Sequence, residues 1–229
     1  MDKIEKIYLI SIERSGCFRI DNIKNLKKYI KKYLNKDIHT VGIDCKHVYG
    51  NPDRINELIN TGVFIKGIGT KRWYKTNGGI SRDFKPGEIG CFLSHREAWI
   101  DMIKNNIKYA LVFEDDSLIT PEKFFNEINN IMNNLPNDVG YISLYHSPQI
   151  RHINKAKKYN DFLKQIDFSL WGTVSYIISL DLANQFIDNL LPIKYPIDWA
   201  ISNYCISKNN IYLSSQNLVN LCDKRSIIR

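Results

Sequence analysis

Three consecutive acidic residues that follow an apolar run are the strongest chemical feature of the sequence. The run covers residues 109–113, and Glu114, Asp115 and Asp116 come directly after it. An apolar run of this length is typical of a parallel strand buried on both faces, and open α/β sheets bind their ligands at the C-terminal ends of such strands. Three carboxylates there would repel one another, and a hard divalent cation with oxygen ligands relieves that repulsion. We therefore expect a metal site at this strand end.

The strand geometry separates the three carboxylates into two groups. Because successive side chains of a strand point to opposite faces, Glu114 and Asp116 should share one face and Asp115 should lie on the other. Glu114 and Asp116 are therefore the expected ligands of Mn²⁺ or Mg²⁺. The alternative is an acidic turn that caps the helix expected after Pro121.

The expected elements alternate along the chain and would hold this strand in the middle of a sheet. Strands are expected at residues 4–11, 38–43, 109–113, 141–145, 173–179 and 211–213, and helices after residue 19, from 86, at 121–134, at 181–190 and from 196. This order predicts an α/β fold with a mostly parallel central sheet and helices on both faces. The first strand and helix carry no Gly-x-Gly-x-x-Gly, which argues against a dinucleotide-binding dehydrogenase.

Length, charge and cysteine content limit the class of protein. The 229 residues fit one α/β domain over 1–229, and the formal net charge of +8 points to an anionic partner such as a nucleotide, a nucleic acid or an acidic membrane surface. The five cysteines are scattered and form no Cys-x-x-Cys pair, so we expect reduced thiols in a cytoplasmic protein. No segment is long and apolar enough to span a membrane, and residues 1–12 lack the apolar region of a signal peptide.

Three other segments each have two interpretations. The helix after residue 19 carries lysines on one side, which favours either peripheral contact with anionic lipid or an ordinary solvated face. Residues 61–87 predict a long functional loop or an ordered surface segment. Cys91 and His95 are four residues apart on a predicted helix and have the residue types of a soft-metal site. No further Cys/His pair accompanies them, so a packed cysteine and a hydrogen-bonded core histidine are the preferred interpretation.

Together, these features suit sugar-nucleotide transfer, in which a metal holds a diphosphate and one carboxylate removes a proton from the acceptor. The residues alone equally allow a metal-dependent nuclease or a phosphoryl transferase.

Several segments resemble the signature of glycosyltransferase family 25, which includes bacterial lipopolysaccharide galactosyltransferases and collagen-type hydroxylysine galactosyltransferases. The resemblance rests on residues 87–95, Trp99, residues 110–116, the arginines after the first strand, residues 40–44, Gly172-Thr173-x-x-Tyr176, Pro196-x-Asp198 and residues 224–227. The chain departs from the family pattern at Ser11, where Asn is usual, and at Cys45, where Gly is usual.

The resemblance implies a GT-A-like fold, a UDP-sugar donor, Mn²⁺ dependence and an inverting reaction. It implies that Glu114 and Asp116 hold the metal and diphosphate, and that Asp115 binds the metal or points toward the donor ribose. Arg14 and Asp44 would contact the donor nucleotide, and of the two loop arginines the spacing favours Arg14 over Arg19. Asp198, at a helix start, would act as the general base, and its alternative is a helix N-cap. Ser94 and His95 would support the acidic strand.

The expected function is therefore transfer of a hexose, galactose first and glucose second, from a UDP-sugar to a hydroxyl of a glycan or glycoconjugate. Two other classes remain open. One is a catalytically silent GT-A module that binds glycan or an anionic surface, and the other is a metal-dependent nucleic-acid enzyme, although no nucleic-acid motif accompanies the positive charge.

Overall fold

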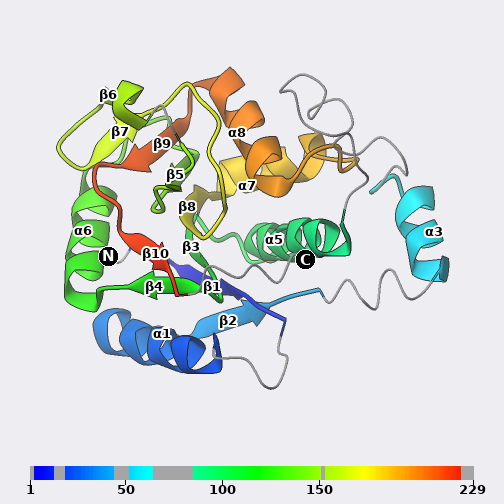
Figure 1. The fold of residues 1–229 in the computed structure, drawn as a ribbon, viewed down its shortest axis with the longest axis horizontal. Helices are drawn as coiled ribbons and strands as arrows, with labels where there is room; N and C mark the ends of the chain where they lie inside the picture. The colour runs from blue at the N-terminus through cyan, green and yellow to red at the C-terminus, as the bar shows by residue number, and fades with distance from the viewer. Residues whose placement is uncertain (1–2, 13–18, 44–51, 64–84, 151–152, 223–229) are drawn as a thin grey trace.

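The computed structural model describes residues 3–12, 19–43, 52–63, 85–150 and 153–222, and its centre is an eight-stranded sheet (Figure 1). The strand order is β2-β1-β3-β8-β5-β9-β7-β6. The strands are β1 (Lys6–Ile10), β2 (Ile38–Val41), β3 (Tyr109–Glu114), β5 (Tyr141–Ser143), β6 (Lys157–Lys158), β7 (Leu163–Gln165), β8 (Ser175–Ser179) and β9 (Ile211–Ser214). A second sheet pairs β4 (Ser117–Ile119) with β10 (Val219–Leu221) in antiparallel orientation.

The central sheet is mixed, with most strands in one direction. Strands β1, β2 and β3 are mutually parallel, and so are β5 and β9. Strand β8 runs antiparallel to both β3 and β5 and joins the two parallel groups. The predicted α/β fold is confirmed, including the mostly parallel sheet.

Helices cover both faces of the sheet, as predicted (Figure 1). The helices are α1 (Arg19–Leu34), α3 (Pro52–Asn60), α5 (Pro86–Lys104), α6 (Pro121–Asn133), α7 (Leu180–Asn189) and α8 (Ile197–Lys208), with a 3₁₀ turn at Ile153–Lys155. Helices α1 and α6 pack on one face, and α5, α7 and α8 pack on the other. None of the helices in the described ranges is long and apolar enough to cross a membrane.

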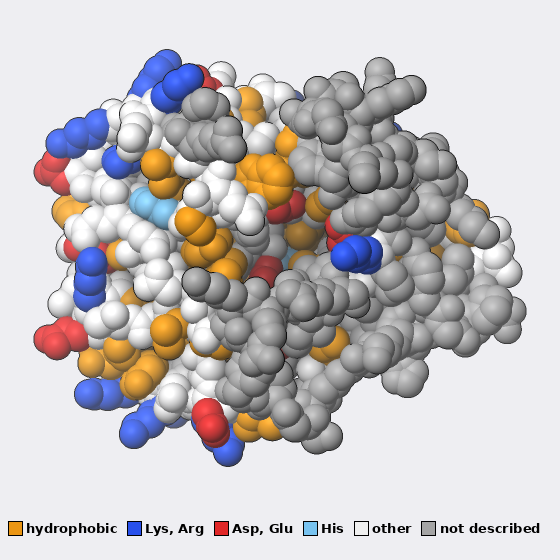
Figure 2. Space-filling view, in the orientation of Figure 1, with side chains coloured by type: hydrophobic (Ala, Val, Ile, Leu, Met, Phe, Trp, Pro, Cys, Tyr) orange, Lys and Arg blue, Asp and Glu red, His pale blue; other side chains and the backbone are white. Residues whose placement is uncertain are grey.

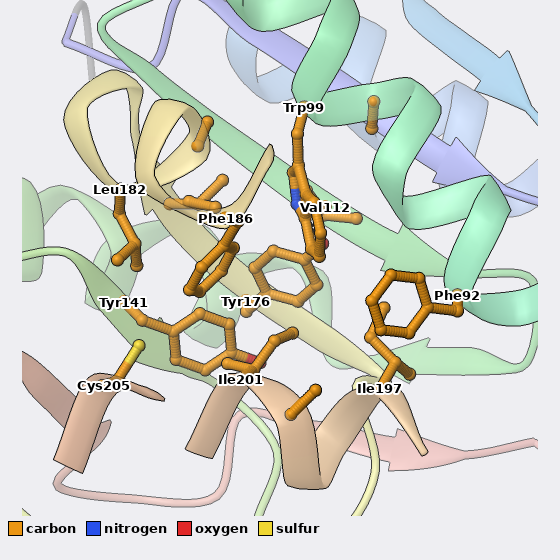
Figure 3. Close-up of a cluster of buried hydrophobic side chains, with 14 of the residues drawn as sticks. Phe92, Trp99, Val112, Tyr141, Tyr176, Leu182, Phe186, Ile197, Ile201 and Cys205 are labelled. Carbon is orange, nitrogen blue, oxygen red and sulfur yellow. The ribbon is translucent and has the colours of Figure 1, made fainter. Parts of the chain in front are cut away.

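The side chains of β3 alternate between two hydrophobic cores. Ala110 and Val112 belong to the core under α5, α7 and α8, whereas Leu111 and Phe113 belong to the core under α1 and α6. Figure 3 shows part of the first core, where the rings of Tyr141 and Tyr176 stack with centroids 4.8 Å apart. Because β3 is buried on both sides, the acidic residues that follow it lie at the edge of both hydrophobic cores.

Short elements account for the main differences from the predicted order. No strand was expected between residues 145 and 173, but Ile153–Lys155 forms the 3₁₀ turn, and β6 and β7 form an antiparallel hairpin. Strands of two or three residues carry too little periodicity to be recognised in a sequence.

Candidate active site

The candidate site lies where the C-terminal ends of β1 and β3 meet, between α1 and α5. Ile10 of β1 is in register with Glu114 of β3. The Glu114 side chain contacts residues of the α5 face, and the Asp115 side chain contacts α1, as strand alternation predicts. Asp116 was expected on the face of Glu114, but it pairs with the same Arg19 as Asp115, because β3 ends at Glu114 and strand alternation does not extend beyond it. Figure 2 shows acidic side chains recessed between hydrophobic ones near the middle of the face in view.

Glu114 is held by two side chains from different elements. Thr173 donates its hydroxyl hydrogen to Oε1 of Glu114 at 2.5 Å, and Nε2 of His95 lies 3.3 Å from the same oxygen. Burial would raise the pKa of Glu114, but His95 and Thr173 outweigh it and lower the pKa below its usual value. The carboxylate is therefore kept ionised, and its side chain remains 21% exposed.

His95 is itself fixed by a buried hydrogen-bond chain. Nδ1 of His95 lies 2.7 Å from the hydroxyl of Tyr176, and that hydroxyl also accepts from Nε1 of Trp99 at 3.3 Å. All three rings are buried, and Trp99 and Tyr176 lie together in Figure 3. The preferred interpretation of His95 as a hydrogen-bonded core histidine that supports the acidic strand is in line with this geometry.

Asp115 is anchored to the opposite side by the start of α1. Its Oδ1 pairs with the guanidinium of Arg19, and its Oδ2 accepts from the Ser11 hydroxyl at 3.0 Å. The side chain of Asn22 donates to the backbone oxygens of Asp115 and Ser117. Both carboxylate oxygens of Asp115 thus have protein donors, which fits an anchoring role better than metal ligation.

Asp116 is the least compensated carboxylate of the triplet. Its Oδ2 lies 3.1 Å from a guanidinium nitrogen of Arg19, but its Oδ1 is buried and accepts no hydrogen bond from any described residue. Burial, together with the negative charge of Glu114, raises the pKa of Asp116 to about 7 even though Arg19 opposes the shift. A buried carboxylate oxygen without a donor, beside a second carboxylate, fits a hard divalent cation.

Asp198 lies in the first turn of α8 and is bound by two backbone groups. Its Oδ2 accepts from the N–H of Gly172, and its Oδ1 accepts from the N–H of Trp199, both at 2.9 Å. Pro196 occupies the N-cap position of α8, so the alternative prediction that Asp198 is the helix N-cap is wrong. Burial raises the pKa of Asp198, and the charge of Glu114 adds to the effect, so this half-buried carboxylate is a stronger base than an ordinary aspartate.

The Cys91 thiol on α5 lies within the electrostatic influence of three carboxylates. Burial raises its pKa, and the negative charges of Glu114, Asp198 and Asp116 raise it further. The structure thus brings Glu114, Asp116 and Asp198 to the same region from β3, the turn after β3 and α8. Arg14 and Asp44, the predicted nucleotide contacts, lie outside the described residues.

Two side chains have roles in the site that the sequence did not predict. Arg19 was considered as a nucleotide contact, second to Arg14, and the structure pairs it with Asp115 and Asp116. Thr173 was part of a recognised motif without a role, and it holds Glu114. A polar residue just before an otherwise apolar strand was the only available signal for Thr173.

Comparisons with known proteins identify the family of this chain. Residues 69–201 match the family described as Glycosyltransferase family 25 (LPS biosynthesis protein). A Glycosyltransferase 25 family member of Drosophila melanogaster is 30% identical over 201 residues, which cover 83% of this chain and 29% of that protein. The human Procollagen galactosyltransferase 2 is 30% identical over 148 residues, covering 60% and 23%. The Lacto-N-neotetraose biosynthesis glycosyltransferase LgtE of Neisseria meningitidis serogroup B is 26% identical over 134 residues, covering 54% and 48%.

The chain therefore spans less than a third of the animal relatives and about half of the bacterial one. Among solved structures, a glycosyltransferase involved in glycosylation of the major capsid of PBCV-1 matches with a TM-score of 0.39 and 9% identity, over 81% of this chain and 65% of that chain. The family match covers more than half of the sequence and includes the acidic strand, His95, Thr173 and Asp198, and on that basis the chain belongs to glycosyltransferase family 25.

Proposed function

We propose that this chain is an inverting, metal-dependent glycosyltransferase that moves a hexose from a UDP-sugar to a hydroxyl of a glycan or glycoconjugate. The observation that carries the proposal is the buried Oδ1 of Asp116 at the end of β3, which accepts no hydrogen bond from the described residues and lies near Glu114. Named relatives include a procollagen galactosyltransferase and a lacto-N-neotetraose biosynthesis enzyme, which favours galactose as the sugar, with glucose second.

Glu114 and Asp116 are the residues that would hold Mn²⁺ or Mg²⁺. When bound, the cation supplies positive charge against the diphosphate that departs from the sugar. Thr173 and His95 keep Glu114 ionised and oriented. Arg19 pairs with one oxygen of Asp116, and the other oxygen accepts no hydrogen bond from the described residues. Arg14 and Asp44 remain predicted contacts of the nucleotide.

Asp198 is the proposed general base. As the acceptor oxygen bonds to the anomeric carbon, the bond from that carbon to the diphosphate breaks, and the hydroxyl proton passes to Asp198. The two backbone N–H groups that bind Asp198 fix its orientation, while its raised pKa favours acceptance of the proton.

Turnover of candidate donors tests the proposal directly. UDP release from UDP-galactose and UDP-glucose is measured with Mn²⁺, with Mg²⁺ and with a chelator. Asp116→Asn should lower turnover by about 10²–10³-fold, as expected when a group that stabilises developing charge is lost. The matched control is Asp161→Asn, because Asp161 lies on the surface with Lys158 and away from the site. Full turnover by Asp116→Asn, or by the parent protein in chelator, would contradict the metal assignment.

Ligand-induced stabilisation separates the rival classes. A ligand that binds the native state raises the unfolding temperature, so UDP with Mn²⁺ should raise it more than GDP, CMP or an oligonucleotide. A larger shift with the oligonucleotide, reduced by salt, would favour a nucleic-acid enzyme. UDP or glycan binding without turnover of any donor would favour the catalytically silent module.

A further inference from the structure

Three metal-ligating side chains meet on the α5 side of Glu114. The ligand atoms of Cys91, His95 and Glu114 all lie within 4.8 Å of one another. Cys91 and His95 are one helical turn apart on α5, which places them on one face, and Glu114 faces them from the end of β3. A thiolate, an imidazole and a carboxylate are the ligands that Zn²⁺ takes in proteins.

The distance between His95 and Glu114 suits two ligands of one cation. Nε2 and Oε1 are 3.3 Å apart, which is longer than most hydrogen bonds between nitrogen and oxygen. Two ligand atoms that each lie about 2.0–2.2 Å from a tetrahedral Zn²⁺ are separated by about 3.4 Å. The pair therefore needs little movement to accept the cation between its atoms.

The second ring nitrogen of His95 is already engaged. Nδ1 lies 2.7 Å from the Tyr176 hydroxyl, and the His95 and Tyr176 rings pack at 5.5 Å. Metal-ligating histidines nearly always bond their other ring nitrogen to a polar partner, which fixes the ring and directs the free nitrogen at the metal. In this cluster, Tyr176 would be that partner.

The charge around the thiol also favours a cation. Glu114, Asp198 and Asp116 act on Cys91 with their negative charge, while the Arg19 guanidinium is paired with Asp115 and Asp116. Such a negative potential attracts a divalent cation to the three ligand atoms.

We propose that Cys91, His95 and Glu114 form a Zn²⁺ site that adjoins the Mn²⁺ or Mg²⁺ site and shares Glu114 with it. On binding, the Cys91 sulfur forms a bond to Zn²⁺ and releases its proton to solvent. Neutral His95 coordinates through Nε2, and its proton resides on Nδ1 toward the Tyr176 oxygen. Because Glu114 cannot serve both cations in full, Zn²⁺ inhibits turnover; this consequence, unlike the binding itself, rests on the proposed function.

Direct binding tests the site without any turnover. Zn²⁺ is titrated into the metal-free full chain by calorimetry, and Co²⁺ serves as a spectroscopic probe of thiolate ligation. We expect one Zn²⁺ per chain, together with a thiolate-to-Co²⁺ charge-transfer band. Cys91→Ser should abolish the band and weaken Zn²⁺ binding at least tenfold. Cys222→Ser, at another half-buried cysteine, is the matched control and should leave both unchanged.

Tyr176→Phe provides a second variant that preserves the core volume. Loss of the hydroxyl should weaken Zn²⁺ binding by about 10–100-fold, the usual effect of removing the partner of a ligating histidine. The site would be overturned by unaltered Zn²⁺ affinity in Cys91→Ser, or by Co²⁺ binding to the parent chain without a charge-transfer band. If Zn²⁺ binds through Cys91 but no donor is turned over, the site stands and the proposed function fails.

Discussion

The fold lowers the pKa of Asp101 and raises the pKa of Asp116. Asp101 lies in α5 near the start of β1, where its Oδ2 accepts from Lys6 Nζ and from the Tyr8 hydroxyl, each at 2.5 Å. Burial would raise the pKa of Asp101, but Lys6 and Tyr8 outweigh it and lower the pKa. Asp116 lies beyond the other end of the sheet, and its pKa is raised to about 7 because burial and Glu114 outweigh Arg19.

The difference separates a structural acid from a functional one. The donors around Asp101 compensate its charge, so it can stabilise the folded chain at neutral pH without any ligand. The donors around Asp116 do not, so the folded chain carries a free-energy cost that a bound cation would remove. The site is therefore distinguished by a buried carboxylate whose charge its neighbours do not compensate, and not by the presence of acidic residues alone.

Asp198→Asn gives the largest expected effect on turnover, because it removes the proposed general base. Turnover should fall by about 10²–10⁴-fold, the range for loss of a general base. Both oxygens of Asp198 accept from backbone N–H groups, so the new amide must turn a donor toward Gly172 or Trp199. UDP affinity, measured by calorimetry, should change much less than turnover.

A different outcome for Asp198→Asn would reassign the residue. Loss of UDP or Mn²⁺ binding would place Asp198 in the donor site. Full turnover would leave it as an anchor of the segment around Gly172, and the base would lie elsewhere.

Arg19→Met should give the largest loss of stability. Removing the guanidinium leaves the buried carboxylates of Asp115 and Asp116 without their shared cation, which costs about 3–5 kcal/mol for a buried pair. Thermal unfolding should begin about 10 °C lower or more. Adding Asp115→Asn to this variant should recover part of the loss, and equal stability of the two proteins would show that Arg19 does not act through charge.

The sequence predicted the parts of the site that depend on local pattern. The apolar run of β3 predicted a buried strand, and its period of two separated Glu114 from Asp115 correctly. The helix beginning at Pro86 was predicted from its proline and apolar spacing, and it carries His95.

Other parts depend on contacts between distant residues, which no local pattern reports. Arg19 reaches Asp115 across 96 positions, and His95 meets Tyr176 across 81. The antiparallel insertion of β8 between two parallel groups depends on chain connectivity, and the apolar pattern of Ser175–Ser179 reads the same in either direction.

Asp101→Asn and Asp116→Asn should have opposite effects on stability, measured without metal at pH 8. Asp101→Asn weakens charge-assisted hydrogen bonds to Lys6 and Tyr8 and should cost about 1–3 kcal/mol, with turnover intact. Asp116→Asn removes an uncompensated buried charge and should leave the unfolding temperature unchanged or higher. If Asp116→Asn lost as much stability as Asp101→Asn, the charge of Asp116 would be compensated by its neighbours like that of Asp101, and the contrast between the two residues would be wrong.

The pH dependence of stability gives the sharpest test of Asp116, because it isolates the titration of one carboxyl. The pKa of Asp116 is about 7 in the folded chain and about 3.9, the ordinary value of an aspartate, in the unfolded chain, so between these values the folded state holds a proton that the unfolded state releases. The free energy of unfolding should therefore fall as pH rises through this window, by up to about 1.4 kcal/mol per pH unit from this group. In Asp116→Asn that contribution is absent, so the stability of the variant relative to the parent should rise from pH 5 to pH 8 in chelator. Mn²⁺ requires the ionised carboxylate and should stabilise the parent at pH 8 more than at pH 5. Urea unfolding of both proteins across this range measures the difference, and parallel curves would show that Asp116 is already balanced and that its burial marks no cation site.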